Sequence, residues 1–377
     1  MHNKKIILKP EDRPDEPPFG LKIAGYFKRL GILNPAIIQR NNEIDLLSRL
    51  IYQDNYGLNS CIVRNQAIIE GKEIRIKKDS KEYPLEELVF QPKSPHGKNG
   101  VEDLRASYVR GETPIHGFLV HYNGPENGDA RTEYLRTKEA EPTNILKWDR
   151  FGIYFPNIGL EEAIEIVSSK NHQQTWINEK NQRNIKSPTA TYPPSSPFLS
   201  TKDCCLWPKK IIKNNKEHYG IIIRLKPDMQ IVYIKDFQEL AKYEFWKNTV
   251  QNIEDNILLG IENKWEKSHI GLAGPPFEIK QGMLIPYHGV VMEPERNYKF
   301  GFALANPDNP QEIWARTEKP FLYATKPWEA NGIVSGKVVF PTGHVNKNGI
   351  IYLFYGAGDK YIAYTTTTEK EILDSLS

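Results

Sequence analysis

Residues 219–234 contain two strand-like runs, Tyr219-Gly220-Ile221-Ile222-Ile223-Arg224 and Gln230-Ile231-Val232-Tyr233-Ile234. β-Branched and aromatic side chains of this kind favour strands, because they pack well on a pleated surface. Short apolar runs of this length indicate strands more often than helices. The stretch therefore predicts two neighbouring strands, and it sets the pattern for the rest of the chain.

The same pattern recurs on both sides of this stretch, from Ala36 near the N-terminus to Tyr364 near the C-terminus. Turn residues separate almost all of the strand-like runs. Helical candidates are few, and the best are Leu160–Ser169 and Gln238–Trp246. Many short strands with almost no helix predict an all-β fold, either a β-sandwich or a β-propeller. No strict repeat is visible, so periodicity gives no number of propeller blades.

The composition of the chain limits its class and its partners. The chain has 377 residues, of which 39% are hydrophobic and 26% charged, as in a globular protein with a sizeable core. Its net charge of +3 comes from 50 basic and 47 acidic residues, so neither nucleic acid nor a membrane is expected as a partner. The three cysteines cannot form a disulfide framework and match no zinc-ligand spacing, so we expect no metal and a reducing compartment.

Residues 1–20 are polar and rich in proline, which excludes a helix there. We expect an extended N-terminal tail, followed by a single domain over residues 21–377. The tail lacks the apolar segment of a signal peptide, and no run in the chain reaches transmembrane length. These features predict a cytoplasmic protein.

Residues 157–201 interrupt the strand pattern. This insertion is polar, with one short helical pattern and a Pro- and Ser-rich cluster at Ser187–Pro197. Loops of this length are usually lids, binding loops or disordered insertions. Because the insertion leads directly into Lys202, we expect it to cover or line a functional site. Shortening it between Ser169 and Pro197 is then expected to change substrate use more than stability.

The first candidate for chemistry is the stretch Gly100-Val101-Glu102-Asp103-Leu104-Arg105. It places two carboxylates and a guanidinium between a glycine-bearing loop at residues 95–99 and a strand-like run at residues 106–109. A carboxylate at such a junction can be aimed into a pocket and held by the neighbouring Arg105, as general acid catalysis requires. The plain alternative is a surface ion pair at the start of a strand.

Four further segments combine charged or polar groups with strand ends or tight turns. They are Lys202-Asp203-Cys204-Cys205-Leu206-Trp207-Pro208, Arg224 after three isoleucines, Tyr287-His288-Gly289, and Tyr355-Gly356-Ala357-Gly358-Asp359. Each segment has a structural alternative as a strand-end charge, a satisfied histidine or an ordinary Gly-Asp turn.

Seven segments, read in chain order, form one set. They are Ile32–Ala36, Gly100–Arg105, Trp148–Gly152, Lys202-Asp203, Tyr287–Val290, Val339–Gly343 and Tyr355–Asp359. Together they resemble glycoside hydrolase family 130, which contains the β-mannoside phosphorylases and some β-mannosidases. The ordered set covers nearly the whole chain, from about Asn34 to Asp359, and is more specific than any single motif. The chain departs from the family pattern at Leu33, where many members carry Arg, and at Leu104, where Pro is usual.

The resemblance implies a five-bladed β-propeller whose catalytic domain holds the active site at the mouth of a central channel. Asp103 matches the catalytic aspartate of the family, a general acid thought to act through a sugar hydroxyl. The residues that match the phosphate-binding groups are Lys202, Arg224 and His288. The residues expected to contact the substrate are Asn34, Arg105, Asp203, Tyr287 and Asp359.

The implied reaction is inverting phosphorolysis of a β-mannoside or mannooligosaccharide, which gives α-mannose 1-phosphate. Inverting hydrolysis would need a second carboxylate to activate water. Phosphate is already an anionic nucleophile, and needs cations that hold it in line. One Asp opposite a Lys, an Arg and a His therefore favours phosphorolysis, with inorganic phosphate as co-substrate and no cofactor. The alternatives are an inverting β-mannosidase and a catalytically silent carbohydrate-binding propeller. The retained Asp103 and basic groups argue against the silent protein.

Overall fold

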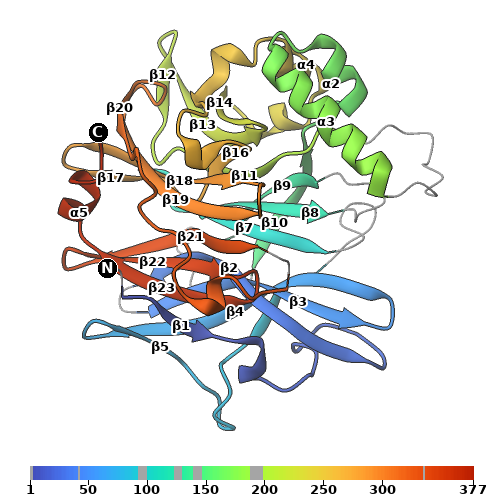
Figure 1. Cartoon of the computed structure of the whole chain (residues 1–377), viewed down its shortest axis with the longest axis vertical. Coiled ribbons are helices and arrows are strands. Elements are labelled where there is room, and N and C mark those ends of the chain that lie inside the picture. Colours follow the sequence, from blue (N-terminus) through green and yellow to red (C-terminus); the bar gives the residue numbers. More distant parts are fainter. Residues whose placement is uncertain are drawn as a thin grey trace.

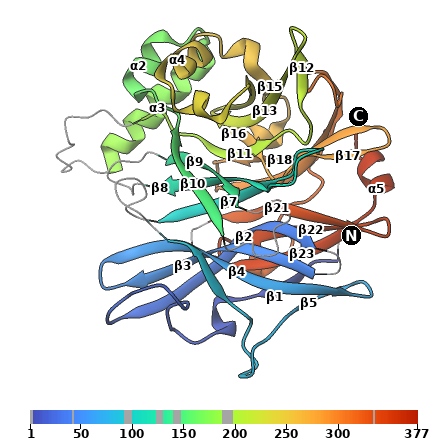
Figure 2. The same ribbon diagram turned by 180° about the vertical axis from the view of Figure 1, so that it is seen from behind.

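The computed structural model describes residues 3–40, 43–91, 100–122, 130–138, 147–186, 198–333 and 336–377. The glycine-bearing loop at residues 95–99 and the cluster Ser187–Pro197 lie outside these ranges. Strands dominate and form four sheets, while the longer helices gather at one corner (Figures 1 and 2). The prediction of an all-β fold is confirmed. The two predicted strands within residues 219–234 are β13 (Lys216–Leu225) and β14 (Asp228–Ile234), which pair antiparallel.

The sheets follow the order of the chain. The first holds β2 (Phe27–Arg40), β3 (Glu43–Asp54), β4 (Gly57–Glu70), β5 (Glu73–Ile76) and β6 (Glu87–Phe90). The second holds β7 (Val101–Ser107), β8 (His116–Tyr122), β9 (Ala130–Thr137) and β10 (Trp148–Phe155). The third holds β13, β14, β11 (Lys202–Leu206), β12 (Ile211–Lys213) and β15 (Ile257–Leu259). The fourth, nine-stranded sheet holds β1 (Lys5–Leu8), β16 (His269–Leu272), β17 (Phe277–Ile279), β18 (Gly282–Val291), β19 (Asn297–Ala305), β20 (Ile313–Arg316), β21 (Lys337–Lys347), β22 (Ile350–Ala357) and β23 (Tyr361–Thr367).

The first strands of the first three sheets, β2, β7 and β11, lie beside one another, and β16 and β21 of the fourth sheet lie next to them. β2 contacts both β7 and β21, β7 contacts β11, and β11 contacts β16. Within the nine-stranded sheet, the parallel pair β19–β21 joins two antiparallel groups through only two residue pairs, Asn297–Lys337 and Tyr298–Val338. This arrangement brings residues from distant parts of the sequence to one region.

Hydrophobic clusters fill the space between neighbouring sheets. Ala36 and Leu47 of the first sheet pack with Val101 and Leu119 of the second. Other clusters join the second sheet to the third, the third to β16 and β18, and the first to β21–β23. A further cluster lies inside the nine-stranded sheet, between its two antiparallel groups. Each boundary between groups of strands therefore has its own core.

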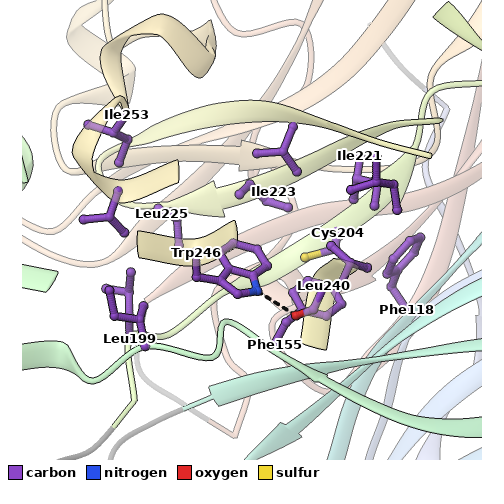
Figure 3. Packing of buried hydrophobic residues seen from close by; sticks show 14 of the residues in the cluster. Phe118, Phe155, Leu199, Cys204, Ile221, Ile223, Leu225, Leu240, Trp246 and Ile253 are labelled. Atoms are coloured by element: carbon purple, nitrogen blue, oxygen red, sulfur yellow. Dashed lines mark hydrogen bonds between the residues drawn. The ribbon is translucent and has the colours of Figure 1, made fainter. Parts of the chain in front are cut away.

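The longer helices cover the third sheet (Figure 1). They are α2 (Leu160–Ile166), α3 (Lys170–Lys186) and α4 (Tyr243–Gln251). Trp246 of α4 is fully buried beside Phe155 and donates an indole hydrogen bond of 2.7 Å to the carbonyl of Leu240 (Figure 3). The short elements are η1 (Pro10–Asp12), η2 (Phe237–Ala241), η3 (Glu254–Asn256), η4 (Lys264–Glu266), η5 (Pro327–Glu329) and α5 (Glu369–Leu373). Within the described ranges, no helix has the length and apolar character needed to cross a bilayer.

The segment predicted as an N-terminal tail is part of the folded body over its described residues. β1 pairs with β23, which comes from the other end of the chain. Lys4 Nζ lies 2.8 Å from Glu329 Oε1, and both side chains are almost fully buried. The extended conformation was predictable from the prolines, but the long-range pairing was not.

The insertion at residues 157–201 contains two helices rather than the one short helix that the sequence predicts. α3 is polar along its length and lacks the apolar periodicity of an amphipathic helix, so its sequence gives no helical signal. Its Trp176 is nevertheless only 1% exposed and belongs to the core beneath it. Shortening the insertion from Ser169 would remove this anchor. We therefore expect a shortening that includes α3 to lower stability as well as to change substrate use.

A Trp176→Phe variant is expected to lower the free energy of unfolding by about 1–3 kcal/mol. Phe fills less of the buried space and cannot replace the indole hydrogen bond of 2.8 Å to the carbonyl of Lys226. Urea unfolding of the variant measures this loss. An unchanged midpoint would contradict an anchoring role for α3.

Candidate active site

The neighbouring strands β2, β7 and β11 each carry a β-bulge at a polar residue. Asn34, Asp103 and Asp203 have positive φ angles of 49°, 36° and 57°. Residues other than glycine adopt such angles at a cost of about 1–2 kcal/mol, so the surrounding structure must hold them. Bulges beside active sites re-aim side chains. The pairing shifts between Leu33 and Ala36, between Glu102 and Arg105, and between Lys202 and Cys205.

The carboxyl group of Asp103 is held from two sides. Asn34 Nδ2 donates a hydrogen bond of 2.9 Å to Asp103 Oδ1, and Arg49 Nη1 lies 3.8 Å from the same oxygen. The side chain keeps 13% exposure, so a ligand can reach it. Burial raises the pKa of Asp103 and outweighs the opposing charges of Arg49 and Arg105. A raised pKa favours the protonated form, which a general acid requires.

Glu102, the residue before Asp103, joins two cations. Its Oε1 accepts a hydrogen bond of 2.6 Å from Arg49 Nη2, and its Oε2 accepts one of 2.6 Å from Lys202 Nζ. Burial alone would raise the pKa of Glu102, but Arg49 and Lys202 lower it to about 2. Lys202 also lies over the ring of Tyr122, 5.5 Å from its centroid. Glu102 is therefore ionised and holds both cations beside Asp103.

Asp203 forms a second ionic centre. Its Oδ2 lies 2.8 Å from Arg224 Nη1, and its Oδ1 lies 3.5 Å from Arg105 Nη2. Burial raises the pKa of Asp203, but its cationic neighbours, Arg224 first and then Arg105, lower it below the usual value. The Asp203 carboxylate thus fixes the orientation of the Arg224 guanidinium.

Lys202 and Arg224 are direct partners across the β11–β13 ladder. Side chains in such positions have Cβ atoms about 5 Å apart, and like charges there destabilise a sheet. Glu102 and Asp203 offset the repulsion, one carboxylate for each cation. The pair is well suited to an anionic ligand, because such a ligand would interact with both cations at once.

His288 is a neutral group in this site. It is fully buried, and burial lowers its pKa to about 3. The Asp203 carboxylate opposes this shift, while the charges of Arg224 and Arg105 act in the same direction as burial. Its Nε2 lies 3.4 Å from Arg224 Nη1 and 3.8 Å from Asp203 Oδ2. The sequence predicted a third cation here. The structure provides a neutral imidazole instead, which can donate one hydrogen bond and accept another.

Aromatic rings border these ionic centres. Phe340 packs 4.7 Å from the ring of His288, and the Arg105 guanidinium lies 5.2 Å from the Phe340 centroid. Tyr298 lies 5.5 Å from His288 between ring centroids, and His269 lies 6.4 Å from both rings. Such low-dielectric walls strengthen charge interactions with a bound ligand.

Asp359 stands in the turn between β22 and β23 with a φ of 51°. Arg296, from the loop between β18 and β19, donates a charge-assisted hydrogen bond to its Oδ2. Ile32 of β2 donates a backbone hydrogen bond of 2.9 Å to the carbonyl of Lys360 in the same turn, so the turn lies beside the strand that carries Asn34. This brings Asp359 into the same region as Asn34 and Asp103.

Two of the predicted substrate contacts have other roles. Arg105 is fully buried, and its guanidinium donates to a backbone carbonyl and approaches Asp203 and Asp103. Tyr287 is fully buried and donates a hydrogen bond of 2.8 Å to Glu266 Oε1. Neighbouring residues of a strand point to opposite faces, so Tyr287 faces away from the side that receives His288. Arg105 is a positioning residue, and Tyr287 belongs to the core.

Sequence reasoning missed two cations of the site, Arg49 and Arg296. Arg49 interrupts the otherwise apolar run Leu46–Ile51 of β3, where Ser48 is the only other polar residue. A charged side chain within a buried strand is a signal for a buried ionic partner. The partner itself could not be predicted, because Glu102 lies on a different sheet. Arg296 follows a Pro-containing turn and gives no comparable signal.

A Gly356→Ala variant is expected to lower kcat/KM about two- to tenfold, because a methyl group at Gly356 would lie 1.8 Å from Asn34 Oδ1. The displaced Asn34 would lose its hydrogen bond to Asp103. Gly159→Ala is the matched control, since nothing lies within 4 Å of that Cβ position. Steady-state kinetics and thermal unfolding of both variants check this. Equal activity of the two variants would contradict the role given to Asn34.

Among the described residues, no group of three or more His, Cys, Asp or Glu side chains has the arrangement of a metal site. The chemistry that the arrangement supports is acid catalysis by Asp103 beside a positively charged anion-binding surface. That surface is formed by Arg49, Lys202 and Arg224, with the neutral His288 next to it.

Comparison with known families and proteins points to one family. The model of glycoside hydrolase family 130, described as beta-1,4-mannooligosaccharide phosphorylase, matches residues 198–377. A 1,2-beta-oligomannan phosphorylase of Thermoanaerobacter sp. is 30% identical over 171 residues, which cover 45% of this chain and 52% of that protein. This chain therefore spans about half the length of that relative. A beta-1,2-mannobiose phosphorylase of Listeria innocua is 24% identical over 361 residues, which cover 92% of this chain and 82% of that protein.

Solved structures share the fold over nearly the whole chain. The complex of the Listeria innocua beta-1,2-mannobiose phosphorylase with beta-1,2-mannobiose covers 97% of this chain and 98% of its own, with a TM-score of 0.62 and 18% identity. A family 130 structure described with glycoside hydrolases that target beta-1,2 mannosidic linkages in Candida mannan covers 90% of this chain and 85% of its own, with a TM-score of 0.61 and 16% identity. The fold is thus common to phosphorylases and hydrolases.

Proposed function

Because this chain belongs to glycoside hydrolase family 130, we propose that it cleaves β-mannosidic bonds by inverting phosphorolysis. The substrates would be a β-mannoside or mannooligosaccharide and inorganic phosphate, with no further cofactor. We also propose the five-bladed propeller of the family. Three sheets would form one blade each, and the two antiparallel groups of the nine-stranded sheet would form the others. Its three free, buried cysteines fit action in the cytoplasm.

One observation carries the choice of phosphorolysis, namely the direct cross-strand pairing of Lys202 with Arg224. Glu102 and Asp203 each offset the charge of one of these cations, and a single anionic ligand would contact both cations at once. Arg224 can present two parallel N–H donors to phosphate oxygens, while Lys202 acts as a point charge. A hydrolase would have no use for this pair, because its nucleophile is water.

In the proposed reaction, Asp103 donates its proton towards the glycosidic oxygen through a sugar hydroxyl. A phosphate oxygen attacks the anomeric carbon from the opposite face while the bond to the leaving sugar breaks. The β-linkage is thereby inverted to α-mannose 1-phosphate, and the shortened acceptor leaves with the proton. Cations hold the phosphate in line and reduce its repulsion by the site carboxylates.

The main competing function is hydrolysis, which the family also includes. An inverting hydrolase needs a carboxylate that can accept a proton from water. Glu102 and Asp203 are the carboxylates nearest to the cations, but each is engaged by two of them. The pKa of Glu102, about 2, makes it a weak base. These properties favour phosphorolysis.

The test is incubation of the purified protein with β-1,2- and β-1,4-linked mannobiose, with and without inorganic phosphate. Phosphorolysis releases mannose 1-phosphate, and its rate depends on the phosphate concentration. Release of free mannose at the same rate from zero to millimolar phosphate would overturn the proposal in favour of a β-mannosidase. Binding without turnover under all conditions would favour the silent protein.

A further inference from the structure

α3 contacts the β13–β14 hairpin through three side chains on one face. His172 Nε2 accepts a hydrogen bond of 3.2 Å from the Gln230 amide, Trp176 Nε1 donates to the Lys226 carbonyl at 2.8 Å, and Glu179 Oε1 accepts from Lys226 Nζ at 2.6 Å. Residues spaced by four and three positions lie on the same face of a helix. The insertion therefore docks specifically on the turn that contains Lys226.

This turn lies next to the anion-binding surface. Lys226 follows Arg224 by two residues at the end of β13. The carbonyl of Pro227 accepts a hydrogen bond of 2.9 Å from Ile270, which follows His269 on β16. Burial lowers the pKa of His269, and the charge of Lys226 acts in the same direction; this charge also interacts with that of Arg224. Lys226 is thus a further cation at the edge of the site. It lies outside the seven sequence segments that carry the family resemblance.

The counter-ion of Lys226 differs from those of the other cations. Lys202 and Arg224 are paired with Glu102 and Asp203, which lie on sheet strands. Lys226 is paired with Glu179, which lies on the inserted helix. The Lys226 and Glu179 side chains keep 31% and 25% exposure, so a ligand can reach the pair. A carboxylate on a separate element is a counter-ion that an incoming anion can replace at Lys226.

We propose that Lys226 is a further phosphate-binding residue, and that Glu179 competes with phosphate for it and thereby limits phosphate affinity. The inference rests on the proposed function. In the free protein Lys226 Nζ donates to Glu179. When phosphate binds beside Lys202 and Arg224, Lys226 turns to a phosphate oxygen and releases the carboxylate of Glu179. The insertion thus adjusts how much phosphate the enzyme needs.

Charge-removing variants of similar size test the proposal. Glu179→Gln is expected to lower the KM for phosphate about three- to tenfold, because the competitor loses its charge while the docking face stays intact. Lys226→Met is expected to raise the KM for phosphate by a similar factor. The KM for the mannoside should change less than twofold in both variants. Calorimetric titration of inorganic phosphate into each variant provides a readout independent of turnover.

Two further variants make the test specific. In the double variant Glu179→Gln/Lys226→Met, the effect of the Glu179 change should vanish, because it acts through Lys226. Glu161→Gln is the matched control, since Glu161 pairs with Lys180 elsewhere in the insertion, with Nζ and Oε1 2.7 Å apart. Its phosphate KM should equal that of the wild type. Thermal unfolding of every variant identifies a loss of fold.

The outcomes separate this inference from the proposed function. A phosphate-dependent wild type whose phosphate KM and Kd are unchanged by Glu179→Gln and Lys226→Met would overturn the inference alone. A wild type indifferent to phosphate, with no calorimetric phosphate binding, would overturn both. A rise in phosphate affinity in Glu179→Gln cannot result from misfolding, so that variant supports the inference even if Lys226→Met is unstable.

Discussion

An Asp103→Asn variant is expected to lose about 10²–10⁴-fold in kcat while it keeps the wild-type fold. The amide has the size of the carboxyl group, and its oxygen can still accept the hydrogen bond from Asn34. It has no proton to donate at the pH of the reaction. Turnover of an unactivated β-mannoside, together with circular dichroism and thermal unfolding, measures both parts of this prediction.

The matched control for Asp103 is Asp308→Asn. Asp308 is 79% exposed and forms a surface ion pair with Lys209, and it is not part of the candidate active site. Because the acid must be protonated, the wild-type rate should fall as pH rises through the raised pKa of Asp103, and the variant should lack this alkaline limb. Near-normal turnover in Asp103→Asn would show that the acid lies elsewhere.

An Arg224→Gln variant is expected to raise the KM for phosphate about ten- to hundredfold. The loss of a charge-assisted hydrogen bond costs about 1.5–3 kcal/mol, which corresponds to that factor. Arg224→Lys keeps the charge but loses the paired donors, so its effect should be intermediate. His288→Asn should have a smaller effect, about two- to tenfold, because His288 is neutral and offers only an uncharged hydrogen bond.

The readout that distinguishes the roles of Arg224 is the ratio of two Michaelis constants. A phosphate-binding residue changes the KM for phosphate much more than the KM for the mannoside. A strand-end charge would change stability, and a sugar contact would change the mannoside KM. Either of those results in Arg224→Gln would contradict the proposed anion site. Thermal unfolding must accompany the kinetics, because Asp203 loses a counter-ion in this variant.

Much of the fold could be predicted from local sequence. The runs within residues 219–234 form a hairpin, and the helical candidate Leu160–Ser169 contains α2. The candidate Gln238–Trp246 overlaps η2 and the first residues of α4, which continues to Gln251. Short apolar runs bounded by turn residues are local signals, so they can be recognised without knowledge of the partner strand. α3 was missed because its stability comes from docking rather than from an apolar stripe, with Trp176 as its buried anchor.

The candidate site could be predicted only in part, because residue types can be read from the sequence but their packing cannot. Asp103, Lys202 and Arg224 are charged residues at strand ends, and their types alone suggested chemistry. Tyr287 and His288 are adjacent, and only the packing of β18 decides which of the two faces the site. The protonation state of His288 depends on burial among residues from other strands. Arg49 could be recognised as unusual, but its partner Glu102 is 53 residues away.

The three bulges also have a consequence for how this chain can change over evolutionary time. Each extra residue reverses the alternation of side chains along its strand. The alternation of side chains between the two faces of the sheet is therefore shifted by one residue on passing Asn34, Asp103 or Asp203. Substitutions on one side of a bulge leave the other side in register, whereas a one-residue gain or loss would turn core side chains towards water. Side chains on either side of a bulge can thus change by substitution, while the length of each strand stays fixed.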